Sequence, residues 1–384
     1  MMFFMTAFFQ FEQPPLRLKK FDPSEALLSF IFSANLAAQD VSGDTATSTS
    51  AGAVIESLKE NPQSATVILA AVSDSPTLAG CAISPLKYPI ISAYQGSTAP
   101  SLFDANLLGF IEASVPLQAH TNGIDCDVIL GAEIAPIPGQ IGDETETEHW
   151  LTLLNQTKEL VKRVNRKVVR LWHSVPLNAD EMNPRFTQAV TKAGFSLVHD
   201  ETHGYIPVAT KRGTAVPLLP EGYSFYCFSD LKPAPEMVPG ILALFDAANT
   251  DIPVGAIEVS PQPWTNERLE QAQATLRRKA NEKITMVLLK DRLPIGFSDV
   301  TRLADSDPTV ADQGHTLIDA NYRGNGLGKL LKEAILITAA NQWPELERVF
   351  TSTADSNAAM CRINNNLGFT PLNRTQVYQT EIIR

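Results

Sequence analysis

The stretch Tyr322-Arg323-Gly324-Asn325-Gly326-Leu327-Gly328-Lys329-Leu330 decides how this chain folds. It follows an apolar segment, Thr316-Leu317-Ile318, and leads into a helix-like pattern from Lys329 to Asn341. Glycines let the backbone turn tightly, so several N–H groups point into one small space. The following helix adds its unpaired N-terminal N–H groups and the positive end of its dipole. We therefore predict a strand, a glycine-rich turn and a helix that together form an anion site, usually one for phosphate.

The spacing of the glycines separates this loop from other phosphate-binding motifs. A dinucleotide fold needs Gly-x-Gly-x-x-Gly and a P-loop needs Gly-x4-Gly-Lys-Ser/Thr, and neither pattern fits. The spacing Arg323-x-x-Gly326-x-Gly328 resembles the pyrophosphate loop of the GCN5-related N-acetyltransferases (GNAT), whose pattern is Gln/Arg-x-x-Gly-x-Gly/Ala. On its own, the loop is equally compatible with a glycine-rich helix entry that binds no ligand.

A second motif strengthens the resemblance. Trp343-Pro344 ends the predicted helix, because proline cannot continue one. The segment 348–353 then reads as a short strand rich in β-branched and aromatic residues. After it comes Asn-x-x-Met-x-x-x-Asn-x-x-x-Gly-Phe, in which the named positions are Asn357, Met360, Asn364, Gly368 and Phe369. The GNAT family has Asn-x-x-Ala-x-x-x-Tyr-x-x-x-Gly-Phe after its fifth strand, at the same spacing.

One position departs from the family pattern. The tyrosine of the family motif usually protonates the leaving thiolate of coenzyme A, and Asn364 occupies that position here. An amide is not a general acid at neutral pH. Either another group or water supplies the proton, or catalysis is slower. Asn364 is alternatively a polar helix residue that bonds locally.

The sequence contains a weak internal repeat. The run from Phe186 to Phe195 resembles the run from Met360 to Phe369, and both end in Gly-Phe. The two starts also agree: the segments 16–21 and 224–228 each read as a strand that feeds an apolar helix-like run, at 26–37 and 237–248. We predict two tandem α/β (α+β) domains, 1–210 and 211–384, with a linker near residues 206–220. Such an arrangement resembles actinobacterial mycothiol-synthase-like acetyltransferases, which implies in each domain a mixed, mostly antiparallel sheet flanked by helices, with a splayed central strand pair.

The first copy lacks the glycine loop. The corresponding region, 134–142, contains two prolines, which remove N–H donors, and an acidic patch follows at Asp143, Glu144, Glu146 and Glu148. Such a patch repels a pyrophosphate, although it is also a favourable start for a helix over 150–164. We expect this copy to bind no cofactor and to serve as structural support and as one wall of the acceptor cleft.

Composition excludes several classes of protein. The formal net charge of −11 argues against a nucleic-acid-binding protein. No apolar run approaches the roughly 20 residues of a membrane span, and Met1 to Phe9 lacks the features of a signal peptide. The four cysteines and six histidines are dispersed, so we expect no metal site and a reduced, cytoplasmic protein that is a monomer or homodimer.

The resemblance also implies which residues bind acetyl-CoA as co-substrate. A hairpin is predicted from 284–289 and 294–300, followed by a strand over 311–319 that carries a bulge in the family. The N–H of Ile318 is expected to polarise the acetyl carbonyl. The cofactor-binding residues implied are Thr316, Leu317, Ile318, Arg323, Gly324, Asn325, Gly326, Leu327, Gly328, Lys329, Asn357, Met360 and Asn364.

An amine acceptor arrives as ammonium and must lose a proton before it attacks. Asp312 lies where some family members place a carboxylate base, and His315 and Gln313 are alternatives, because side-chain alternation cannot be followed across a bulge. Glu258 and Trp264 are candidates for the acceptor pocket. The sequence thus predicts an N-acetyltransferase that acts on a primary amine of a small molecule by direct attack. A coenzyme-A-binding module with little turnover and a protein N-acetyltransferase are the alternatives.

Overall fold

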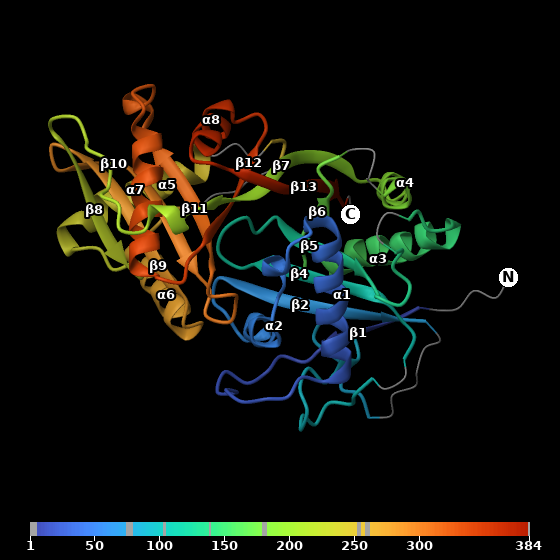
Figure 1. Cartoon of the computed structure of the whole chain (residues 1–384). Helices are drawn as coiled ribbons and strands as arrows, with labels where there is room; N and C mark the ends of the chain where they lie inside the picture. Colours follow the sequence, from blue (N-terminus) through green and yellow to red (C-terminus); the bar gives the residue numbers. More distant parts are fainter. Residues whose placement is uncertain are drawn as a thin grey trace. The chain divides into compact units, whose positions relative to one another are not determined.

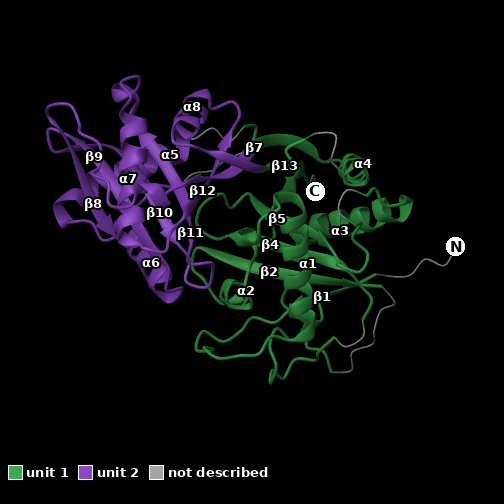
Figure 2. Ribbon diagram, in the orientation of Figure 1, with its two compact units in different colours: residues 1–200, 255–260, 373–384 green, residues 201–254, 261–372 purple. Residues whose placement is uncertain are grey.

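The computed structural model describes residues 6–73, 80–102, 105–137, 140–178, 183–251, 255–257 and 262–382. The chain forms two compact units (Figure 2). Unit 1 contains residues 1–200, 255–260 and 373–384, and unit 2 contains residues 201–254 and 261–372. The boundary between the two sequence repeats near residue 210 remains a prediction.

Unit 1 contains a mixed, mostly antiparallel sheet. Its strands, in spatial order, are β3 (Ile90–Ile91), β1 (Ala7–Phe11), β2 (Ser64–Val72), β4 (Leu107–Pro116), β5 (Gly123–Leu130), β6 (Val168–Val175) and β13 (Thr370–Glu381). Neighbouring strands are antiparallel except for the pairs β1–β3 and β5–β6.

Helices cover both faces of this sheet. On one face α1 (Glu25–Ser42), which crosses in front of the strands in Figure 1, and α2 (Ala51–Leu58) contribute to an apolar core that includes Phe30 and Phe110. On the other face α3 (Glu144–Arg163) and α4 (Pro184–Lys192) contribute to a core that includes Trp150 and Phe186. Burial of these apolar side chains is the main favourable term in holding the layers together.

Unit 2 repeats this arrangement. Its strands, in spatial order, are β7 (Ser196–Pro207, with residues 201–207 in this unit), β12 (Arg348–Ala354), β11 (Val310–Ile318), β10 (Leu293–Arg302), β9 (Glu282–Lys290) and β8 (Tyr223–Ser229). Helices α5 (Val238–Asp251) and α6 (Asn266–Arg278) pack on one face. Helix α7 (Leu327–Gln342) packs on the other face, beside α8 (Ala358–Asn366). Single 3₁₀ turns lie in both units: at Thr45–Thr47 in unit 1, and at Ala209–Lys211, Pro235–Met237 and Ala320–Tyr322 in unit 2.

Each unit is completed by the last strand of the other sequence repeat. Strand β7, which ends the first sequence repeat, pairs with β12 in unit 2, from Arg348 opposite Pro207 to Ala354 opposite Glu201. Strand β13, which ends the second repeat, pairs with β6 in unit 1, from Arg374 opposite Val175 to Glu381 opposite Val168. The two repeats have therefore exchanged their last strands.

Both sheets contain a splayed parallel pair, as predicted. In unit 2, β11 pairs with β12 only over residues 310–312, opposite 348–350, and the remainder of β11 has no partner on that side. In unit 1, β5 pairs with β6 only over residues 123–126, opposite 168–171. The unpaired backbone groups beyond each point are available to a ligand.

Most of the predicted elements are confirmed, but one is wrong. The hairpin, the strand before the glycine loop, and the helix and strand after it correspond to β9, β10, β11, α7 and β12. The predicted strand at residues 16–21 does not exist: this segment contains a turn in which Leu18 N–H bonds to the Pro15 carbonyl at 3.0 Å. The first strand is β1, within the apolar segment that precedes two prolines. No helix in the described residues is long and apolar enough to cross a membrane.

Candidate functional site

The glycine loop leaves the start of α7 without a cap of its own. Gly324 and Gly326 have φ angles of 84° and 74°, in the left-handed region that side-chain-bearing residues rarely adopt. Gly326 is the N-cap residue of α7, and among the described residues no side chain caps the first turn of the helix. No atom within 4 Å would meet a Cβ added at either glycine. The first N–H groups of α7 are therefore open to an external anion.

Gly328 has a different role in the same loop. A Cβ at this position would lie 3.3 Å from the Ile363 side chain on α8 and 3.7 Å from the Ile318 side chain on β11. A hydrogen atom in place of a side chain thus permits the first turn of α7 to pack closely against both elements.

The polar side chains of the loop are partly engaged within unit 2. Arg323 donates through Nε to the Ile318 carbonyl at 2.8 Å and through Nη2 to the Asp251 carboxylate at 2.6 Å. Asn325 contacts the backbone carbonyls of the turn itself. Lys329 is exposed. The backbone and Lys329 are free to meet an anion, whereas Arg323 would first have to exchange its partner Asp251.

A bulge in β11 arranges the strand that leads into the loop. Ser298 pairs with Thr316 and Val300 pairs with Gln313, so Asp299 alone faces two residues, Gly314 and His315. Asp299 is buried, forms an ion pair with Lys283 at 2.5 Å and accepts the His315 N–H at 2.9 Å. A Cβ at Gly314 would overlap the Asp299 carboxylate, which explains the glycine there.

The bulge decides which side chains share a face. Because it adds one residue, Asp312 and His315 both lie on the face of β10 that carries Phe297 and Thr301. Gln313 turns to the other side and donates to Ser298 Oγ and to the Asp299 carbonyl, both at 2.9 Å. The structure therefore brings two of the three candidate bases together on the α5 and α6 side of the sheet.

The surroundings shift the proton affinities of these two groups in opposite directions. Asp312 and His315 are both exposed on the surface, so neighbouring atoms remove only part of their hydration. This desolvation raises the pKa of Asp312, and His203 partly offsets the effect. It lowers the pKa of His315; Asp299 opposes this shift and Lys283 adds to it. The raised pKa makes Asp312 a stronger base than an ordinary carboxylate, whereas the lowered pKa keeps His315 neutral and makes it a weaker base than an ordinary imidazole.

Sequence reasoning missed the contribution of β7. His203 and Tyr205 lie on this strand, opposite Ser352 and Phe350 of β12. The Arg348 guanidinium lies over the Tyr205 ring at 5.1 Å, and the Tyr205 and Phe350 ring centroids are 5.9 Å apart. These residues extend the face that carries Asp312. No local sequence signal marks them, because their position depends on which strand β7 pairs with.

The second motif forms α8, where it faces β12. Asn357 caps the helix by accepting the Met360 N–H at 3.2 Å, and Met360 is half-buried. Asn364 is only 1% exposed and donates through Nδ2 to Thr353 Oγ1 at 2.6 Å. Its Oδ1 is buried without a hydrogen-bond partner in the described residues. Asn364 therefore bonds across to the strand and not within its own helix.

The other predicted residues take defined positions. Thr316 Oγ1 bonds to Ser298 Oγ at 2.7 Å, and Leu317 and Ile318 are buried beside the glycine loop. Trp264 packs on Phe245 with centroids 5.1 Å apart and lies under the Arg268 guanidinium at 4.3 Å. The backbone N–H of Trp264 donates to Asp246 Oδ1 at 2.6 Å, so Trp264 forms part of the α5 and α6 layer. Glu258 lies outside the described residues.

Unit 1 differs at each corresponding position. The first turn of α3 is capped by Asp143, whose carboxylate accepts the Thr145 N–H at 2.8 Å. Strand β5 pairs with β4 without a register shift from Gly109, opposite Leu130, to Ser114, opposite Asp125. Glu112 faces Asp127 on these strands, and burial, with repulsion from Glu112, raises the pKa of Asp127 to about 7. At the start of α3, the Asp143 carboxylate thus occupies the position that Gly326 leaves open at the start of α7.

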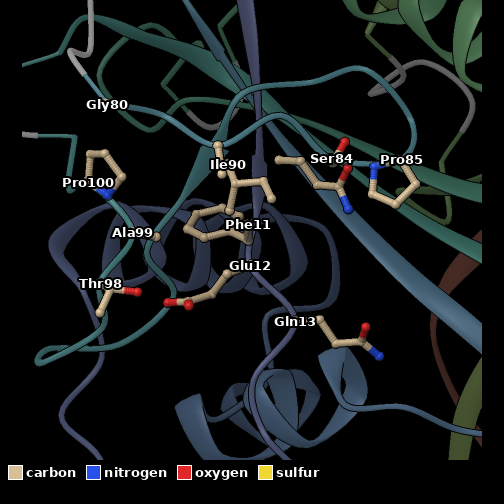
Figure 3. Close-up of a pocket in the computed structure, with 12 residues that line it drawn as sticks. Phe11, Glu12, Gln13, Gly80, Ser84, Pro85, Ile90, Thr98, Ala99 and Pro100 are labelled. Carbon is tan, nitrogen blue, oxygen red and sulfur yellow. The ribbon is translucent and has the colours of Figure 1, made fainter.

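Unit 1 does contain a cavity of roughly 410 Å³ (Figure 3). It is lined by residues of β1, the segment that follows β1, and the segments 80–90 and 98–100. The Glu12 carboxylate at its wall accepts the Ala93 N–H at 3.0 Å and the Ser97 hydroxyl at 2.7 Å. None of the predicted site residues lines this cavity. The hydrogen bonds of the Glu12 carboxylate hold the surrounding loops in place.

The site residues do not form a metal centre. No group of three or more His, Cys, Asp or Glu side chains in the described part of the chain could hold a metal ion. The four cysteines are unpaired thiols, and the Cys361 thiol contacts the Ala354 carbonyl within its own helix–strand corner.

Comparisons with known proteins agree with this geometry. Residues 239–369 match the family model described as Acetyltransferase (GNAT) family. The fold is similar to a tandem GNAT protein from the clavulanic acid biosynthesis pathway, with 17% identity, a TM-score of 0.65 and 98% of each chain covered. It is also similar to a GCN5-related N-acetyltransferase from Sphaerobacter thermophilus, with 12% identity, a TM-score of 0.60 and 98% and 96% of the two chains covered. None of the curated protein sequences matches the chain.

Proposed function

We propose that this protein is an acetyl-CoA-dependent N-acetyltransferase. Residues 239–369 match the acetyltransferase (GNAT) family model, and the whole chain has a fold similar to that of a tandem GNAT protein. The active site lies in unit 2, and the acceptor is a primary amine of a small molecule. The enzyme acts in the cytoplasm, as a monomer or homodimer, and without a metal.

One observation carries the proposal: the open N-terminus of α7 follows directly from a strand that has separated from its neighbour. The helix offers uncapped N–H groups to a pyrophosphate. The unpaired edge of β11 beyond Asp312 offers backbone groups to an extended arm with amide bonds. Coenzyme A carries both chemical features on one molecule, so the residues present fit it.

The acceptor side supplies the proton chemistry. Asp312 and His315 lie on one face, and either group can accept the proton that the ammonium must lose. The Asp312 carboxylate on this face can also attract a cationic amine. The amine nitrogen then attacks the thioester carbonyl directly, and the N–H of Ile318 stabilises the charge that develops on the carbonyl oxygen.

Acetyl transfer to a panel of primary amines tests this function. Purified protein is incubated with acetyl-CoA and each amine, and release of the free thiol and formation of the acetylated amine are measured. We expect transfer to at least one small amine, and no transfer when Asp312→Asn and His315→Gln are combined. A panel that includes peptides with free amino groups distinguishes a protein acetyltransferase, which would prefer the peptides.

Asn364 favours a second candidate function, an acyl-coenzyme-A-binding module with little turnover. The residue cannot donate a proton to the leaving thiolate as a tyrosine would. Tight binding of coenzyme A in calorimetry without transfer to any amine would support this second candidate. A protein that does not bind coenzyme A would contradict both.

A further inference from the structure

Lys332 is the unexpected residue of α7. The neighbouring buried positions of this helix are apolar, among them Leu331, Ala334 and Ile335, whereas Lys332 carries an amine and is only 1% exposed. Its Nζ donates a hydrogen bond to Thr351 Oγ1 at 3.3 Å. No carboxylate in the described residues forms an ion pair with it. An uncompensated buried amine is costly and rarely persists without a role.

The surroundings of Lys332 form a polar row inside unit 2. Thr351 and Thr353 are two residues apart on β12, so their side chains share one face about 7 Å apart. Lys332 bonds to the first hydroxyl, and Asn364 bonds to the second at 2.6 Å. All four side chains are at least nine-tenths buried. The Lys332–Thr351 pair thus lies two residues along β12 from the Thr353–Asn364 pair, and Asn364 stands where the family places its proton-donating tyrosine.

The row also borders the splay. β11 and β12 are paired only as far as Asp312 and Phe350, so Thr351 and Thr353 follow the point of separation. The edge of β12 that faces β11 is unpaired there, which is where the thioester arm lies under the proposed function. Under the proposed function, the thioester arm would therefore lie along β12 beside Thr351.

We propose that Lys332, through the hydroxyl of Thr351, supplies the proton that the leaving thiolate takes up, in place of the missing tyrosine. The inference rests on the proposed function. When the C–S bond breaks, its electron pair goes to sulfur and the ammonium of Lys332 gives up one proton to it. Lys332 is left neutral, which its apolar surroundings favour. The base on the acceptor side takes one proton from the amine and passes it to solvent. This proton balances the one that Lys332 gives up to the sulfur.

The electrostatics of the position are consistent with this role. Burial alone lowers the pKa of Lys332 to about 7, and no shift from Glu333, Arg348 or Arg362, on the surrounding elements, contributes. A thiol titrates at about 8.5, so transfer from this ammonium to a thiolate is downhill. An ordinary lysine, with a pKa near 10.4, would be a poor donor.

A titration of Lys332 tests the inference without reference to turnover. The protein is labelled with ¹³C at the ε carbon of lysine, the Lys332 signal is assigned by its loss in Lys332→Met, and its shift is followed with pH. Coenzyme A and desulfo-coenzyme A, which lacks only the sulfur, are added in separate experiments. We expect coenzyme A to move the titration midpoint by at least one pH unit relative to desulfo-coenzyme A.

Kinetics with an accepted amine give the second measurement. Lys332→Met and Thr351→Val should lower kcat, the former by about 100-fold, and leave the KM for acetyl-CoA unchanged. Thr338→Val is the matched control, because its hydroxyl bonds only to the Ala334 carbonyl on α7. Wild-type kcat should fall as pH rises above about 7, and this decline should be absent in Lys332→Met.

The outcomes separate the two proposals. Identical Lys332 titrations with coenzyme A and desulfo-coenzyme A, or an unchanged kcat in Lys332→Met, would overturn the role of Lys332 and leave the proposed function intact. Failure of wild-type protein to bind either compound would overturn the proposed function, and the role of Lys332 with it.

Discussion

The first turns of α3 and α7 occupy corresponding places in the two copies. The first turn of α3 is capped by a carboxylate side chain, whereas the N-cap residue of α7 is a glycine. In unit 1 the carboxylate of Asp143 bonds to the Thr145 N–H, and Glu144 and Glu146 follow in the same turn. In unit 2 Gly326 provides no side chain, and the turn carries no acidic residue. A helix start attracts negative charge in either case. The difference is whether the chain supplies that charge itself or leaves the place to a ligand.

The strands before these helices differ in the same sense. In unit 2 the bulge at Gly314 and His315 re-aims side chains and places two proton acceptors on one face. In unit 1 an ion pair between Asp125 and Arg170, at 2.7 Å, spans β5 and β6 near the point where they separate. In unit 1 the two polar groups pair with each other, whereas in unit 2 Asp312 and His315 remain exposed on the surface.

The largest expected effect comes from closing the open helix start. Gly326→Val introduces a β-branched side chain at φ 74° and into the space of the anion site, and it should weaken coenzyme A binding at least 100-fold in calorimetry. Gly213→Val is a matched control, because Gly213 has φ 75° and equally open surroundings but lies after β7. Equal losses of affinity in the two variants would show that backbone strain, and not the anion site, is responsible.

The second effect concerns the acceptor face. Asp312→Asn should lower kcat about 10²- to 10³-fold, because it removes the carboxylate base without altering size. Since the pKa of Asp312 is raised, wild-type activity should increase as pH rises through that pKa, and the variant should lose this limb. His315→Gln serves as the comparison. If only His315→Gln abolishes the limb, the histidine is the base and Asp312 is not.

A smaller effect should be visible in the stability of the folded chain. The pKa of Lys332 is about 7 when folded and about 10.4 when unfolded, so the unfolded state holds more protons between these values. The Lys332 contribution to the free energy of unfolding should therefore rise with pH from about 7 to 10. Chemical denaturation of Lys332→Met should lack this rise, and a rise of the same size in the variant would assign it to other groups.

The smallest effect should come from the capped helix of unit 1. The hydrogen bonds from Thr145 lower the pKa of Asp143, so its contribution to stability is present above about pH 4 and disappears as pH falls through the lowered pKa. Asp143→Ala should lower the thermal midpoint slightly at neutral pH and not at pH 2. It should not create a second coenzyme A site, because the prolines before α3 remain; a stoichiometry of two would contradict our account of this copy.

Local patterns explain what the sequence predicted well. The glycine loop, the hairpin and the strand–helix order of the second half depend on residues close together in the chain, and all were placed correctly. The first strand was misplaced because the alternating segment 16–21 resembles a strand, whereas pairing with β2 selected Ala7–Phe11. His203 and Lys332 were missed because their importance depends on partners far away in sequence. The cofactor and catalytic roles of the predicted residues still require the experiments above.

The exchanged last strands have a consequence for how the two copies depend on each other. A cut near residue 210 would leave unit 1 without β13 and unit 2 without β7, so neither fragment would keep a complete sheet edge. The first copy supplies the strand that carries His203 and Tyr205, whether or not it binds a ligand of its own. Unit 2 therefore depends on the first copy for this strand, even though α3 of that copy has no open N-terminus.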